Sequence, residues 1–391
     1  MTPAAFVPQE ILERIFRHAA TGRLDVPSKA WHLSCYPFSD TIMAIGQVPL
    51  VNRHWNEAAT RILYWELVVS ELPQEGRFAT LSKFALLTST LEHSPRLQTH
   101  VRSLRLNTWI MESYDREKFE SLKLRILRCC PLVQQIWIHG WMPSYLDQFR
   151  TTIATFTNLR YLSIHPFRDY RIPFSFFEGL ETMIRGWPNL EHLNIGGRVI
   201  TDDGGNSVRS TRNPPNNKSV ARLTLYGLSP LERFTCIIPN LVELSLLVHG
   251  DPILLLLRAQ RWKHTLRRLK LSVGLAIADT QWRAVMMALC GFKRLQRLII
   301  RAVFPLILLE FPETLEKITF MVRSEDLPVL FYFLDQKLPR SIRTVKFAAN
   351  YPRESAQEAR CDLESTLRVF CEKRRWKWLV HDSYRYWISS S

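Results

Sequence analysis

Basic side chains recur at fixed places beside short apolar runs along this chain. Each run has the form apolar-x-x-apolar-x-apolar, and the places considered are its third, fifth and seventh positions, which lie between or directly after the apolar residues. Eight basic residues occupy these places, compared with one acidic residue, Glu243. The basic residues are Arg105, Arg222, Arg268, Lys270, Arg297, Arg301, Lys317 and Lys346. Guanidinium and ammonium groups bind phosphate and carboxylate. The pattern predicts a cationic surface for an acidic or phosphorylated ligand, with a solvated basic face that binds no ligand as the alternative.

Aromatic side chains occupy the same places in other runs. Trp137 and Tyr161 follow the spacing of the basic residues, so we include both in the candidate binding surface. The imidazoles of His139, His165 and His192 stand at equivalent positions. The predicted surface therefore mixes positive charge with aromatic rings.

Motifs of catalysis and metal binding are missing from the sequence. It contains no H-E-x-x-H, no G-x-S-x-G, no G-x-x-x-x-G-K and no G-x-G-x-x-G after a strand. The eleven histidines lack the spacing of metal ligands, and the seven cysteines form no Cys-x-x-Cys pair. We therefore expect a non-catalytic protein without a metal or a cofactor.

The cysteines and the apolar runs bear on the compartment. An odd number of cysteines argues against a disulfide framework and favours a reducing environment. The first residues lack the pattern of a secretory signal, and no apolar run approaches the ~18 residues of a membrane span. We expect a cytoplasmic or nuclear protein that does not engage a membrane.

The apolar runs form an internal repeat. Its ten copies start at Val101, Val133, Leu159, Leu190, Val220, Leu241, Leu266, Leu295, Leu315 and Ile342. Successive starts are about 27 residues apart on average. The alternating end of each copy predicts a short strand with one buried face. Helices are predicted between the strands, and several end at proline or glycine; they cover residues 117–130, 174–187, 231–238 and 279–290.

The energetics of one copy require stacking. Burial of three aliphatic side chains stabilises a copy by roughly 5–9 kcal/mol. Ordering ~27 residues costs about 1–2 kcal/mol for each residue in backbone entropy. Neighbouring copies must therefore share buried faces, which predicts a solenoid. A stack also accommodates 391 residues, which exceed the ~250–300 at which single cores stop growing.

The repeat resembles the leucine-rich repeat, whose period and L-x-x-L-x-L strand it matches. The resemblance implies an α/β solenoid, a horseshoe with a parallel sheet whose concave side carries the candidate binding surface. The family's Asn or Cys, eight residues after each start, is Trp109, Trp141 or Phe167 in the first three copies. We therefore expect an irregular horseshoe. Unrelated strands of an ordinary α/β protein are the alternative.

The N-terminal residues follow a different pattern. Helices are predicted over residues 8–18 and 49–64, where apolar residues recur at helical spacing. Two short amphipathic helices cannot bury their apolar faces alone. They need the repeats or another protein as a partner.

These two stretches together resemble an F-box. The matching residues read Val7-Pro8-x-Glu10-Ile11-Leu12-x-x-Ile15-Phe16 and Leu50-Val51-x-Arg53-x-Trp55-Asn56-x-x-Ala59. The resemblance implies docking onto a Skp-family adaptor, which joins F-box proteins to a cullin–RING ubiquitin ligase. Carried over by position, the adaptor-binding residues are Pro8, Ile11, Leu12, Ile15, Leu50, Val51 and Trp55.

The two resemblances imply a substrate-recognition subunit of an SCF-type (Skp–cullin–F-box) E3 ubiquitin ligase, which acts in ubiquitin-dependent protein degradation. The repeats would bind a protein client, and the F-box would bind the adaptor. One alternative is a non-ligase interaction scaffold whose helices only cover the first repeat. The other is a nucleic-acid-binding repeat protein, which the formal charge of +16 prompts; the resemblance disfavours it.

The expected domains follow from these assignments. An F-box-like domain covers residues 1–66, with an insertion at 19–47 that is longer than the usual connection in the family. A leucine-rich-repeat domain covers residues 67–391. Within it, the Gly-, Pro- and Asn-rich residues 196–218 predict a mobile loop, and residues 354–391 are expected to cap the last repeat.

Overall fold

The computed structural model describes residues 8–21, 53–70, 77–107, 116–166, 171–172, 174–196, 198–199, 219–226, 231–248, 252–273, 279–301, 311–323 and 341–350, together with 365, 368, 369 and 372. The chain divides into two compact units, Met1–Leu190 and Glu191–Ser391. Leu50, Val51 and most of the predicted insertion, loop and cap lie outside the described residues.

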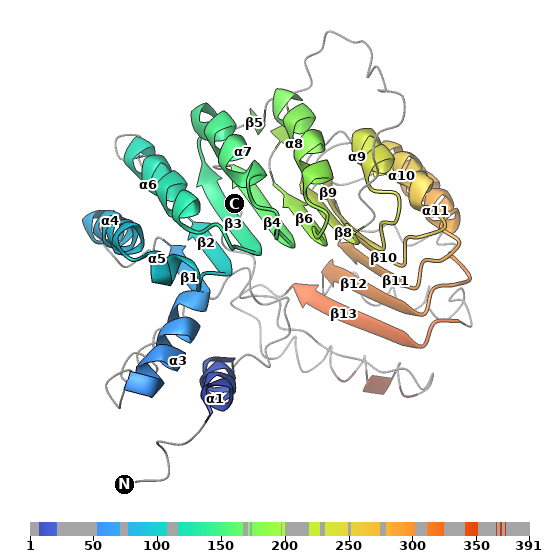
Figure 1. Ribbon diagram of the computed structural model, residues 1–391. Coiled ribbons are helices and arrows are strands. Elements are labelled where there is room, and N and C mark those ends of the chain that lie inside the picture. The colour runs from blue at the N-terminus through green and yellow to red at the C-terminus, as the bar shows by residue number, and fades with distance from the viewer. Residues whose placement is uncertain are drawn as a thin grey trace. The chain divides into compact units, whose positions relative to one another are not determined.

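The first unit begins with helices and continues into alternating strands and helices. Its helices are α1 (Gln9–Thr21), α3 (Arg53–Trp65), α4 (Arg77–His93), α5 (Pro95–Gln98), α6 (Arg116–Cys129), α7 (Leu146–Ala154) and α8 (Phe174–Gly186), with a 3₁₀ turn η5 (Pro143–Tyr145). Its strands are β1 (Glu66–Ser70), β2 (Ser103–Asn107), β3 (Gln135–Trp141), β4 (Tyr161–Pro166) and the short β5 (Arg171–Ile172). Strands β1 to β4 pair in parallel in chain order, and α4, α6, α7 and α8 follow one another along one side of them (Figure 1).

The second unit repeats the same construction. Its strands are β6 (His192–Ile195), the short β7 (Arg198–Val199), β8 (Arg222–Tyr226), β9 (Glu243–Val248), β10 (Arg268–Val273), β11 (Arg297–Arg301), β12 (Lys317–Arg323) and β13 (Thr344–Asn350). Its helices are α9 (Leu231–Ile237), α10 (Pro252–Ala259) and α11 (Asp279–Cys290), with a 3₁₀ turn η6 (Gln260–Trp262). Strands β6 and β8 to β13 pair in parallel in chain order. Each unit is therefore α/β with an open parallel sheet, which is compatible with the solenoid expected from the sequence.

All ten predicted strands are confirmed, and the four predicted inter-strand helices are confirmed to within one residue at each end. The sequence prediction omitted the two short strands β5 and β7, and it omitted β1, which pairs with β2 ahead of the first recognised copy. The predicted domain boundary after residue 66 falls inside this strand. Tyr64, Leu67 and Val69 fit the repeat spacing if tyrosine counts as apolar, so the signal for β1 was present.

Matching apolar residues of successive strands form a buried ladder in each unit. In the first unit, Leu104 pairs with Ile136 and Ile136 with Leu162, and all three are fully buried. The corresponding ladder of the second unit consists of Leu193, Leu223, Leu244, Leu269, Leu298 and Ile318, each of them buried. Each strand thus buries its apolar residues against both of its neighbours, as the energetics of a single copy require.

A second ladder runs through the backbone just before the strands. The carbonyl of Ala221 accepts hydrogen bonds from the N–H groups of Val242 and Glu243, both at 2.9 Å. The carbonyl of Val242 in turn accepts from Arg267 and Arg268, at 2.9 and 3.0 Å. The same double acceptance occurs at Arg102, Gln134, Glu191, Arg267, Gln296 and Glu316. This carbonyl ladder aligns β3, β4 and β8 to β13 with the strand that comes before each of them.

A buried ion pair supports β3 from helix α6. Lys123 is fully buried, and its Nζ donates to Glu120 Oε1 at 2.8 Å and to the carbonyl of Gly140 at 3.1 Å. Burial raises the pKa of Glu120, against the opposing effect of the Lys123 ammonium and of the Met142 N–H. The register of β3 shifts at Gly140, whose φ of 71° lies in the left-handed region that favours glycine. The ammonium of Lys123 therefore holds a β-bulge in place.

None of the described helices is long and apolar enough to cross a bilayer.

The buried pair leads to a stability prediction. Substitution Lys123→Met should lower the free energy of unfolding by about 3–5 kcal/mol, because it leaves the Glu120 carboxylate buried without its cation. Urea unfolding followed by tryptophan fluorescence measures this loss. The double variant Glu120→Leu/Lys123→Met removes both charges and should recover more than half of it. A double variant as unstable as the single variant would contradict this account.

Candidate functional site

Five of the polar residues on the second unit's strands lie in one row. Arg222, Glu243, Arg268, Arg297 and Lys317 are the first residues of strands β8 to β12, and each is the register partner of the next. Adjacent strands are ~4.8 Å apart, so their side chains emerge at that spacing on one face. The backbone N–H of each residue donates to the carbonyl ladder. We call these five residues the charged row.

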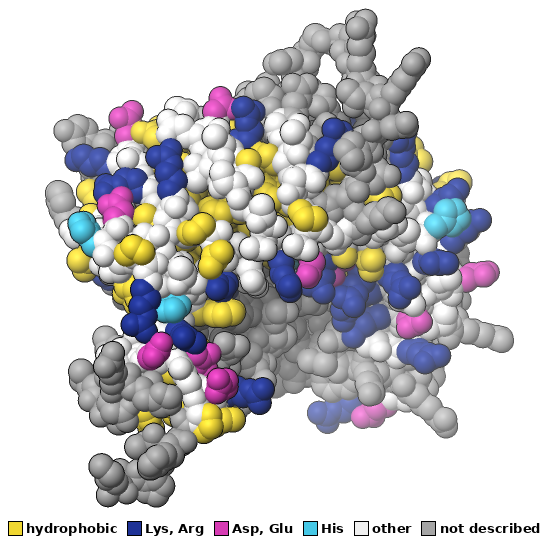
Figure 2. Space-filling view, viewed as in Figure 1, with side chains coloured by type: hydrophobic (Ala, Val, Ile, Leu, Met, Phe, Trp, Pro, Cys, Tyr) yellow, Lys and Arg dark blue, Asp and Glu magenta, His cyan; other side chains and the backbone are white. Residues whose placement is uncertain are grey.

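Glu243 links the two arginines on either side of it. Its Oε2 lies 3.3 Å from Arg268 Nη1 and 3.7 Å from Arg222 Nε. Arg297 stands beside Arg268 on the next strand and makes no ion pair within the described part of the chain. Figure 2 shows Lys and Arg side chains gathered around an acidic one where these strands begin. The row therefore holds more positive than negative charge.

The other predicted basic residues of this unit follow the row along the strands. Lys270 lies two residues beyond Arg268 on β10, hence on the same face, and its side chain is exposed. Arg301 ends β11, and Lys346 lies in β13 opposite Thr319. The side chains of Arg301 and Lys346 lie outside the described residues.

The predicted residues of the first unit form a stacked column instead. The guanidinium of Arg105 lies 4.3 Å from the centre of the Trp137 ring, and that ring stacks on Tyr161 with centroids 4.5 Å apart. On its other side, Arg105 Nε lies 2.7 Å from Glu66 Oε1. We call Glu66, Arg105, Trp137 and Tyr161 the aromatic column.

The aromatic column alters the role expected of Arg105. Its side chain is only 14% exposed, and Glu66 compensates its charge. Arg105 thus contributes to packing between strands, and a cation over an indole ring adds ~0.5–2 kcal/mol. The sequence prediction missed this, because Glu66 belongs to strand β1, which the prediction omitted.

The described histidines and cysteines give no metal or thiol centre. His139 and His165 stack with ring centroids 4.4 Å apart, and His139 Nε2 lies 3.1 Å from Ser163 Oγ. Among the residues that the structure describes, no three or more His, Cys, Asp or Glu side chains could hold a metal ion. Burial raises the pKa of Cys130 to about 12, so this thiol stays protonated at neutral pH.

Helices α1 and α3 pack against each other through a small apolar core. Leu12 is 2% exposed and packs with Ala58 and Ala59, and Trp55 covers the same core in a half-buried position. Ile11 and Ile15 point away from it and are 42% and 52% exposed. Of the predicted adaptor-binding residues, Leu12 therefore serves this helix pair. Pro8, like the two isoleucines, is exposed to solvent.

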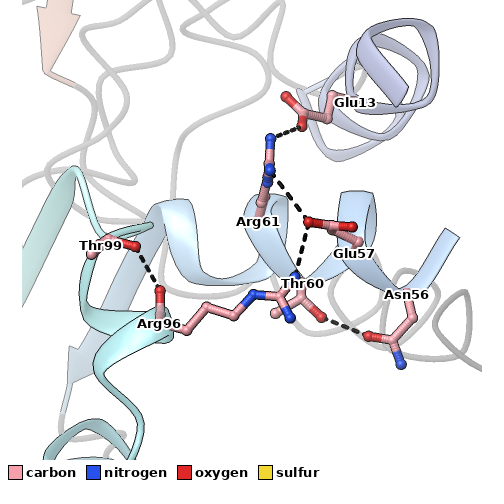
Figure 3. A network of polar contacts seen from close by, with 7 residues as sticks. All are labelled: Glu13, Asn56, Glu57, Thr60, Arg61, Arg96 and Thr99. Carbon is pink, nitrogen blue, oxygen red and sulfur yellow. Dashed lines mark hydrogen bonds and ion pairs between the residues drawn. The ribbon is translucent and has the colours of Figure 1, made fainter. Parts of the chain in front are cut away.

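A polar network connects the helix pair to the first repeat (Figure 3). Arg61 of α3 contacts Glu13 of α1 at 3.1 Å and Glu57 of its own helix at 3.4 Å. Glu57 also accepts a hydrogen bond from Arg96 of α5 at 2.9 Å. These groups are partly exposed, so each pair contributes about 0.2–1 kcal/mol or less. The network fixes orientation more than it adds stability.

No protein-family model matches the chain, and no curated protein matches it.

His100 lies in the turn after α5, close to the charges of the helix-pair network. Its pKa is lowered by burial first, then by the charges of Arg61, Arg96 and Arg102, while Glu13 opposes the shift. Histidine in the unfolded chain titrates near pH ~6.5. Below that pH the unfolded chain binds more protons than the folded chain, so stability present at pH 7.5 is lost as the pH falls.

We therefore expect His100→Gln to lose less stability than the native chain between pH 7.5 and pH 5.5. Urea unfolding at the two pH values measures the difference. The native chain, unfolded at the same two pH values, is the reference. Equal losses in the two proteins would show that His100 does not couple folding to protons.

Proposed function

We propose that this protein is an F-box and leucine-rich-repeat substrate receptor, the client-binding subunit of an SCF-type E3 ubiquitin ligase. Helices α1 and α3 would bind a Skp-family adaptor and, through it, the cullin–RING ligase. The strand faces of the repeats would bind an acidic or phosphorylated client protein. In this role the chain contributes position rather than catalysis and works in the cytoplasm or nucleus.

The exposed isoleucine pair of α1 is the observation that carries the proposal. Helix α1 already buries Leu12 within the chain, so its inner face has a partner. Ile11 and Ile15, one turn apart, then form a second apolar stripe that faces solvent. A helix with apolar residues on both sides is typical of one that is buried on both sides. A partner protein would cover the outer stripe.

The connection between the helix pair and the repeats supports the same role. Strand β1 begins directly where α3 ends, at Glu66, and the network of Arg61, Glu57 and Arg96 joins α3 to α5. A client on the repeats of the first unit would thus be held at a fixed orientation to the adaptor. Such tethering raises the effective concentration of a client near the ubiquitin-transfer site.

The scaffold alternative differs in one respect that can be measured. If α1 and α3 only cover the first repeat, the chain needs no adaptor, and the outer isoleucines have no binding partner. Co-expression with a Skp-family adaptor, followed by purification through a tag on this chain, separates the two functions.

We expect the native chain to retain the adaptor and the double variant Ile11→Asp/Ile15→Asp to bind it at least about tenfold more weakly. The reason is that two partly exposed aliphatic side chains, each worth ~1 kcal/mol or more on burial, are replaced by charges. Calorimetric titration of purified chain with adaptor gives the affinities.

Leu86→Asp is the matched control, because Leu86 is an equally apolar, exposed residue on α4. It should leave adaptor binding unchanged. The proposal fails if the native chain retains no adaptor, or if Leu86→Asp weakens binding as much as the α1 variant does.

A further inference from the structure

We propose that Arg268, Arg297 and Lys270 form a phosphate-binding site for a phosphorylated segment of the client, with Glu243 as the internal counter-ion that the phosphate replaces at Arg268. The inference deepens the proposed function and rests on the client-binding part of it. It does not depend on the adaptor.

The first support is the environment of Arg297. It stands directly opposite Arg268 on the adjacent parallel strand, and Lys317 stands opposite it on the other side. Like charges in register destabilise a pair of strands. Arg268 has Glu243 as a partner and Lys317 also has an interaction of its own, whereas Arg297 makes no ion pair within the described residues. An anion between Arg268 and Arg297 would relieve this repulsion.

The second support is the position of Glu243. A carboxylate already bridges two arginines of the row, through a single oxygen at 3.3 and 3.7 Å. Its position shows that the guanidinium of Arg268 binds an oxyanion on this face of the sheet. Both contacts are partly exposed to solvent, so they are weak and exchangeable. If a ligand takes Arg268, Glu243 keeps Arg222 as its partner.

The charges of the site favour phosphate over carboxylate. With Glu243 paired to Arg222, the two guanidinium groups of Arg268 and Arg297 carry two positive charges. A phosphorylated side chain carries about −1.5 to −2 charges and three acceptor oxygens, which match two guanidinium forks. A carboxylate would only replace Glu243 at Arg268 by a group of the same kind, and with Lys270 included it would compensate one of the three positive charges of the site, whereas a phosphate compensates up to two. Lys270, exposed on the same face, can approach the third oxygen.

The test uses the purified full chain and two fluorescent peptides of one neutral sequence, with phosphoserine or glutamate at the same two positions. We expect the native chain to bind the phosphoserine peptide at least about tenfold more tightly, as measured by fluorescence polarisation. Arg297→Gln should weaken binding of this peptide about tenfold. Arg297→Lys should weaken it less, because the charge remains while the fork is lost.

The Glu243→Gln variant examines the counter-ion directly. Removal of one negative charge beside the site should tighten binding of the glutamate peptide by about two- to threefold. Coulomb energy scales with ligand charge, so the logarithm of the gain should be about twice as large for the phosphoserine peptide. Glutamine preserves the size of the side chain, and circular dichroism confirms that each variant is folded.

Two exposed residues of the same unit provide matched controls. Arg294→Gln removes a positive charge, and Glu313→Gln removes a negative charge, from turns outside the strands. Both should change binding less than twofold. Losses as large as that of Arg297→Gln would indicate diffuse attraction and overturn the inference.

Two further outcomes would also overturn it. The first is equal affinity for the two peptides, or no binding of either. The second is tighter binding of a single-stranded oligothymidine than of the phosphoserine peptide at physiological salt, with a steep salt dependence, which would assign the row to nucleic acid. Adaptor co-purification is measured separately, so loss of this site and loss of the adaptor role are distinguishable.

Discussion

The alignment of the strands depends on backbone carbonyl oxygens that each accept two N–H groups from the repeat that follows. In the second unit this double acceptance recurs at Glu191, Ala221, Val242, Arg267, Gln296 and Glu316. It fixes the backbone of the residue that opens each strand, so the strands start level with one another. Because side chains then alternate between the two faces, matching apolar residues are buried and matching polar residues are aligned on the opposite face. The charged row is thus a consequence of backbone alignment as much as of side-chain chemistry.

The two units use the same backbone positions for different chemistry. In the first unit Arg105 is enclosed by Glu66 and Trp137, and its charge is compensated inside the chain. In the second unit Arg268 and Arg297 stand side by side, with Glu243 on one side only. Packing therefore dominates the face of the first unit, whereas electrostatics dominates the face of the second. The positive charges of Arg268 and Arg297 repel each other at this position, and a bound anion would reduce that repulsion.

Sequence spacing predicted the strands well, because the repeat period directly reflects the buried face of each strand. The spacing could not predict whether each charged side chain is enclosed by its neighbours or exposed to solvent. Arg105 and Lys270 occupy the same position of the motif, yet one is enclosed and the other exposed, since neighbours on adjacent strands are some 30 residues away in the chain. Nor could spacing separate Leu12, which faces α3, from Ile15, which faces solvent. The buried Lys123 is a similar case, because it depends on the bulge at Gly140.

Strand β6 pairs directly with β8. The register of these strands therefore does not depend on how many residues lie between them in the sequence. Leu193 pairs with Leu223, and the Glu191 carbonyl accepts from Ala221 and Arg222, although the Gly-, Pro- and Asn-rich residues come between the two strands in the sequence. Closing a longer loop adds little free energy, about 0.6 kcal/mol for each doubling of its length. Insertions between residues 200 and 218, including a fluorescent or affinity domain, should therefore leave the alignment of the neighbouring strands intact. The repeat array thus has a natural place at which the chain can gain or lose sequence independently of the surface it presents.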